Sequence, residues 1–173
     1  EILSRNLSYY ALLDEAQKTR LQALTGLLVK EKHWEGAGGL EVTDEIRVTI
    51  AAHACLLLLG LRLDDYRNVE SIIVYPSTVV PPERTLGFFE TTLEPLDQEA
   101  PIDGEAHYQG PVIIIWDAVL KSAMHPASGH NVIYHEFAHK LDMLDGLADG
   151  TPPLRGRDAY RDWVRTCSEE YLR

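Results

Sequence analysis

The pattern His-Glu-x-x-His, formed by His135, Glu136 and His139, constrains this chain more than any other feature of its sequence. Residues four apart lie on the same face of an α-helix, about one turn apart along the axis. Two imidazoles placed in this way can converge on one Zn²⁺ ion, and the glutamate can reach a water molecule at the open coordination position. The pattern therefore predicts a helix that binds zinc through His135 and His139, with Glu136 as a general base.

A third zinc ligand is harder to assign. A catalytic zinc takes three protein ligands and keeps one position open, yet no histidine follows His139, and Glu169 and Glu170 are the only later glutamates. Either glutamate satisfies the spacing, although two adjacent acids near a helix end are typical of a solvated surface. Asp142 falls on the same helix face as the histidines and has two interpretations. It is either a carboxylate that orients His139 or an exposed acid near the helix end.

The spacing of apolar residues predicts the helices. A helical period extends over residues 7–32, and a second begins near Thr43, which has the character of an N-cap. This second helix covers residues 46–61 and is apolar on nearly every face, so we expect it to be buried. The motif lies in a predicted helix over residues 130–144, and Asp158 is expected to cap a last helix whose apolar face carries Tyr160, Trp163, Val164 and Cys167.

Strands are predicted where β-branched residues cluster, at residues 69–75 and 112–116. Residues 76–106 contain five prolines and predict an irregular segment. Pro111 indicates that the second strand lies at a sheet edge or contains a bulge. For residues 110–116 two interpretations remain: an edge strand that pairs with an extended substrate, or a buried core strand.

Length and charge limit the class of protein. The chain has 173 residues, which predicts one domain, and 16 basic against 27 acidic residues give a net charge of −11. So acidic a protein is a poor partner for nucleic acid or an anionic membrane surface, and the sequence has no apolar run of membrane-spanning length.

Two cysteines with no pairing pattern, Cys55 and Cys167, favour a reducing, cytoplasmic location. His53 lies within an apolar helix and is expected to be a core histidine.

Several stretches resemble one known family. They are residues 131–133 and 135–142 around the motif (His-Glu-Phe-Ala-His-Lys-Leu-Asp), residues 39–58, residues 73–76, residues 110–112, and Trp116. From about residue 20 to its end, the chain is similar to the Mlc titration factor A family of zinc metallopeptidases. The similarity is specific because it extends well beyond the short motif.

The resemblance implies an α+β, zincin-like fold with a gluzincin-type site, in which N-terminal helices pack on a small mixed sheet. It implies that His135 and His139 bind Zn²⁺ and that Glu136 is the general base. The family's third ligand is a glutamate on a later helix, and this position lies beyond Arg173. Residues 1–173 are therefore expected to form a single metallopeptidase domain without its C-terminal part.

Two functions follow from the residues and the resemblance. The first is zinc-dependent hydrolysis of peptide bonds in a peptide or protein substrate, with endopeptidase and aminopeptidase activity both open. The alternative is a regulatory binding protein that sequesters the transcriptional repressor Mlc and so controls the glucose phosphotransferase system. An acidic surface is compatible with a DNA-binding partner, whose own surface is basic.

Overall fold

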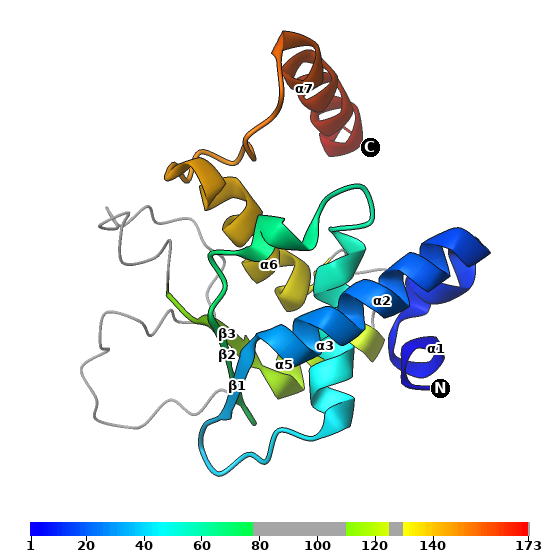
Figure 1. Ribbon diagram of the computed structural model, residues 1–173, viewed down its shortest axis with the longest axis vertical. Coiled ribbons are helices and arrows are strands. Elements are labelled where there is room, and N and C mark those ends of the chain that lie inside the picture. Colours follow the sequence, from blue (N-terminus) through cyan, green and yellow to red (C-terminus); the bar gives the residue numbers. More distant parts are fainter. Residues whose placement is uncertain (78–109, 125–129, 173) are drawn as a thin grey trace.

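Helices surround a small sheet in the computed structural model, which describes residues 1–77, 110–124 and 130–172 (Figure 1). In chain order the helices are α1 (Ile2–Asn6), α2 (Glu15–Glu31), α3 (Asp44–Leu56), α5 (Trp116–Met124), α6 (Val132–Asp142) and α7 (Arg157–Tyr171). The 3-10 helices are η1 (Ser8–Leu12), η2 (Leu63–Tyr66) and η4 (Met143–Asp145), and the strands are β1 (His33–Gly36), β2 (Ser71–Tyr75) and β3 (Val112–Ile115).

The described strands form a parallel sheet in the order β1-β2-β3. We predicted a mixed sheet, whereas the strands among the described residues all run parallel. Helix α3 lies between β1 and β2 in the chain and provides the crossover that a parallel pair requires. Strand β1 was not predicted, because its four residues, His-Trp-Glu-Gly, include no β-branched side chain. Gly36 ends this strand where a Cβ atom would collide with the carbonyl oxygen of Leu40.

The helix predicted over residues 7–32 begins later than expected. Asp14 caps α2, because its side chain accepts a hydrogen bond from the backbone N–H of Gln17 at 2.8 Å. The side chain of Gln17 in turn accepts from the backbone N–H of Asp14 at 3.0 Å. This capping box starts the helix at Glu15, and the residues before it form α1 and η1 instead.

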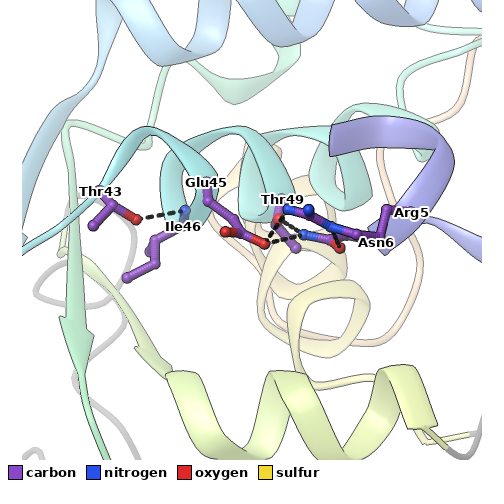
Figure 2. Close-up of polar contacts among 6 residues, drawn as sticks. All are labelled: Arg5, Asn6, Thr43, Glu45, Ile46 and Thr49. Carbon is purple, nitrogen blue, oxygen red and sulfur yellow. Dashed lines mark hydrogen bonds and ion pairs between the residues drawn. The ribbon is translucent and has the colours of Figure 1, made fainter. Parts of the chain in front are cut away.

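Helix α3 begins as predicted, because the Thr43 hydroxyl accepts a hydrogen bond from the backbone N–H of Ile46 at 3.3 Å. It ends at Leu56 and not at residue 61, since Leu57, Leu58, Leu59 and Leu61 each donate a backbone hydrogen bond to the third residue before them, in tighter turns. Figure 2 shows how α1 is held against α3: the Asn6 amide donates to Glu45 Oε1 at 3.1 Å and to Thr49 Oγ1 at 2.8 Å.

The two C-terminal helices differ in burial. Helix α6 packs in the core and is followed by η4, which ends at Gly146 in the left-handed conformation with φ of 88°. Helix α7 stands away from the other helices (Figure 1) and contains no buried residue. Its N-cap is Gly156, so Asp158 lies in the first turn and the predicted cap is wrong. The apolar face that we predicted is exposed at Tyr160 and Val164.

The hydrophobic core fills the space between the sheet and helices α2, α3 and α6. As predicted, α3 is buried over most of its length. Each of these helices, and strands β2 and β3, contributes fully buried side chains, including Leu21, Leu28, Ile50, Ile72, Ile114, Ile133 and Phe137. The predicted irregular segment 76–106 lies outside the described residues from residue 78 onward.

Candidate metal centre

Helix α6 carries the His-Glu-x-x-His motif and is held by a cap at its start and by core packing along one face. Asn131 caps the helix: its Oδ1 accepts hydrogen bonds from the backbone N–H groups of Ile133 at 3.0 Å and Tyr134 at 3.1 Å. The core-facing side of α6 includes Ile133 and Phe137, both fully buried. The Phe137 ring meets the Tyr66 ring edge-on, with 5.0 Å between the centroids. These contacts fix the rotation of the helix about its axis, and with it the direction of the motif side chains.

His135 and His139 lie on the exposed side of α6 and point toward one another. Their Nε2 atoms are 3.2 Å apart, and their rings are nearly perpendicular. Two nitrogen ligands of a tetrahedral zinc, each about 2.0–2.1 Å from the ion, are separated by roughly 3.3–3.4 Å. The observed separation fits two zinc ligands, and it also allows one neutral ring to donate a hydrogen bond to the other.

The electrostatic surroundings keep His139 in the form that binds metals. Burial lowers the pKa of His139, the nearby His135 lowers it further, and Asp142 raises it in part. A lowered pKa favours the neutral imidazole, whose free nitrogen lone pair can bind a metal ion. The His139 ring is therefore suited to metal binding at neutral pH.

Glu136 lies beside these rings and is half-buried. Burial raises the pKa of Glu136 above its ordinary value, while His135 and Lys140 act in the opposite direction. A carboxylate with a raised pKa accepts a proton more readily, and this property suits a general base.

The described residues do not complete a metal site. In residues 1–77, 110–124 and 130–172, no group of three or more histidine, cysteine, aspartate or glutamate side chains is placed to hold a metal ion. Glu169 and Glu170, the two glutamates considered from spacing, are exposed on α7. The structure brings together the residues of the motif and does not bring these glutamates to them.

The burial of Asp142 excludes one of the two interpretations of this residue. Only 7% of its surface is exposed, so it is not an exposed acid. Its Oδ2 accepts a hydrogen bond from the backbone N–H of Gly150 at 3.0 Å, and this contact secures the loop after α6. Its Oδ1 is buried and has no hydrogen-bond partner among the described residues. Asp142 acts on His139 through its charge, and whether it orients that ring stays a prediction.

Two buried polar residues next to the motif were not predicted from the sequence. Lys140 is 7% exposed, and its ammonium donates a hydrogen bond to the carbonyl oxygen of Gly110 at 2.7 Å. Burial lowers the pKa of Lys140, and the carboxylate of Glu136 partly offsets this effect. Asn68 is 3% exposed, and its amide donates to the carbonyl oxygen of Lys140 at 2.7 Å. A signal was present for the lysine, because it is three residues after the buried Phe137 and thus on the core side of the helix.

The segment 110–116 divides between two elements. Residues Val112–Ile115 form β3, which lies at the edge of the described sheet, and Trp116 begins α5. Val112 and Ile114 are buried, whereas Ile113 and Ile115 are half-buried. Strand β3 packs against α6. It is thus a core strand on one face, and its role in pairing with substrate remains a prediction.

His53 occupies the core position expected of it. His53 is 5% exposed, and its Nδ1 is 2.9 Å from the carbonyl oxygen of Thr49 in the previous turn of α3. Cys55 is buried, Cys167 is exposed, and both are free. No helix in the described part of the chain combines the length and apolar character needed to cross a membrane.

A helix that directs two imidazoles together beside a half-buried carboxylate is the arrangement expected of a metal-dependent hydrolase. Comparison with known families agrees: the model of the glucose-regulated metallo-peptidase M90 family matches residues 1–173, and the chain belongs to this family.

Curated relatives include proteins with and without an assigned name. An uncharacterized protein of Synechocystis sp. is 34% identical over 176 residues, which cover 98% of this chain and 61% of that relative. Mlc titration factor A of Serratia proteamaculans is 32% identical over 149 residues, which cover 84% of this chain and 54% of that relative. The protein of the same name from Salmonella agona is 32% identical, with 83% and 53% covered. The chain thus spans between half and two thirds of the length of these relatives.

Proposed function

We propose that the protein is a zinc-dependent peptidase in which His135 and His139 hold the metal and Glu136 is the general base. The observation that carries this proposal is the 3.2 Å separation of the two Nε2 atoms on one helix face, next to the half-buried Glu136. Zinc, when bound, polarises the scissile carbonyl and acidifies a water molecule.

The side chains of this chain then divide the work of proton transfer. The Glu136 carboxylate accepts the proton that water loses as its oxygen adds to the carbonyl carbon. The same carboxyl group then donates this proton to the nitrogen of the departing amine, so that Glu136 is restored as a carboxylate at the end of the cycle. Burial supports both steps, because a raised pKa lets the carboxyl group hold the proton between them.

We infer that residues 1–173 belong to one metallopeptidase domain with a zincin-like fold and a gluzincin-type site, whose third ligand is a glutamate on a later helix. An extended peptide pairs with the strand that begins near residue 110, because β3 lies beside α6 at the edge of the described sheet. The cytoplasm is the expected location.

Replacement of the general base tests the proposal. In the zinc-loaded protein, Glu136→Gln should lower kcat for peptide hydrolysis by roughly 10²–10⁴-fold, the usual contribution of a general base, with zinc content unchanged. Glu41→Gln, which changes an exposed glutamate outside the motif, is the matched control and should keep full activity. Release of new amino groups from a peptide library measures the activity. Hydrolysis at an undiminished rate by Glu136→Gln would show that the proposed mechanism is wrong.

A second function is favoured by the names of two relatives, both called Mlc titration factor A. We propose as the alternative that the protein binds the repressor Mlc, with peptidase activity secondary. Glu136→Gln separates the two functions, because a binding surface away from the metal should keep its affinity when hydrolysis is lost. Titration of the variant with purified Mlc measures this affinity, and an absence of binding by the unsubstituted protein contradicts the alternative.

A further inference from the structure

Lys140 is a buried cation on the helix that carries the metal-binding motif. Only 7% of its surface is exposed, and its ammonium donates a hydrogen bond to the carbonyl oxygen of Gly110 at 2.7 Å. Burying a charge is unfavourable, and a well-packed apolar side chain of similar volume often serves stability equally well. Stability alone is therefore a weak reason for a lysine at this position.

The contact of Lys140 joins two elements that are distant in the chain. Lys140 lies on α6 directly after His139, and Gly110 comes two residues before the start of β3. The backbone of Lys140 is itself fixed, because its carbonyl oxygen accepts a hydrogen bond from the Asn68 amide at 2.7 Å. The ammonium therefore extends from a well-anchored point of the motif helix to the beginning of the edge strand.

Within the part of the chain that the structure describes, the bond from Lys140 is the hydrogen bond that holds the backbone of Gly110. Pro111 separates Gly110 from β3 and has no N–H to donate to a neighbouring strand. The register of β3 with β2 begins at Val112, opposite Ile72. The bond from Lys140 thus ties the backbone just before β3 to the motif helix.

We infer that Lys140 is a positioning residue, whose ammonium fixes the start of strand β3 relative to the motif helix and so sets where an extended peptide lies over His135 and Glu136. This inference rests on the peptidase proposed above. It assigns to Lys140 no contact with the reacting atoms. Its effect should therefore grow with the length of substrate backbone that pairs along the strand.

Two substitutions and a control test this role in the zinc-loaded, full-length protein. Lys140→Met keeps the length of the side chain and removes its charge, Lys140→Arg keeps a donor, and Lys30→Met changes an exposed lysine on α2. Hydrogen–deuterium exchange of residues 110–115 and kcat/KM for a long peptide and a single-residue chromogenic amide are measured for each protein.

We expect Lys140→Met to speed exchange in residues 110–115 by about tenfold, the factor that corresponds to loss of one hydrogen bond from a charged donor. For the long peptide, kcat/KM should fall by a similar factor through KM, while the short amide is hydrolysed at the rate of the unsubstituted protein. Lys140→Arg should restore much of both properties, and Lys30→Met should match the unsubstituted protein.

Unchanged exchange in Lys140→Met overturns the inference, whatever the hydrolysis rates are. An equal loss for long and short substrates also overturns it, because a general structural defect acts on both. If the unsubstituted protein binds zinc and hydrolyses no peptide, the peptidase proposal itself fails and this inference fails with it. If the unsubstituted protein hydrolyses peptides normally and Lys140→Met leaves the ratio of kcat/KM for the long peptide to kcat/KM for the short amide unchanged, this inference alone is rejected.

Discussion

His53 shows how a single buried side chain ties the core to solution pH. Burial lowers the pKa of His53, and a hydrogen bond to the Thr49 carbonyl only partly offsets this effect. Because the carbonyl can only accept, the Nδ1 atom carries the proton of the neutral ring. The Tyr134 ring lies 5.6 Å from the imidazole, so protonation would place a charge next to the helix of the motif.

The folded protein should therefore lose stability in mild acid through His53. As pH falls below about 6.5, the unfolded chain binds a proton that the folded chain refuses, so the free energy of unfolding decreases. The loss is at most about 1.4 kcal/mol per pH unit for one proton. Urea unfolding at a series of pH values should show a shallower pH dependence for His53→Gln. The exposed His33→Gln is the control, and equal slopes in the two variants would contradict this assignment.

The motif residues were predictable from the sequence, whereas their supports were not. His135, Glu136 and His139 stand at a spacing that has meaning only on one helix face. Lys140 stands three residues after Phe137, at a spacing typical of the core side of the helix, but a lysine on a helix is usually solvated and its burial was not predicted. Its burial depends on Gly110, thirty residues earlier, and such a contact becomes visible only in the folded chain.

At the scale of elements, the start of α6 has a direct energetic test. Asn131→Ala removes the acceptor of two backbone N–H groups and should lower the free energy of unfolding by about 1 kcal/mol. Asn131→Asp keeps an acceptor at the positive end of the helix and should leave stability near that of the unsubstituted protein. Urea unfolding monitored by circular dichroism gives both values. An Asn131→Ala variant as stable as the parent would mean that packing alone defines this helix end.

Elements with local signals were predicted best. The cap at Thr43 was anticipated because it depends on neighbouring residues. Strand β1 was not predicted, because its pairing with β2 is non-local and its four residues include no β-branched side chain that would indicate a strand. The apolar period over residues 7–32 continues through Asp14 and so did not indicate that the helix begins there. The start is set by the capping box between Asp14 and Gln17.

At the scale of the whole molecule, helices on a sheet were anticipated, while the parallel direction of the described strands was not. The prediction of a mixed sheet came with the family resemblance, and nothing within the strands themselves indicates the direction in which they pair. Direction depends on the crossover through α3, which a reading of separate segments does not reveal. The exposure of α7 could not be predicted from its own segment either, because an apolar face predicts packing but does not identify the partner.

The zinc content of the full-length protein tests the central claim most directly. Atomic absorption should be measured for the unsubstituted protein, for His135→Ala and for the exposed His33→Ala. The account predicts about one zinc ion per chain in the unsubstituted protein and in His33→Ala, with loss of this zinc in His135→Ala. A zinc-free unsubstituted protein, or full zinc content in His135→Ala, would contradict a metal centre on α6 and with it the proposed peptidase.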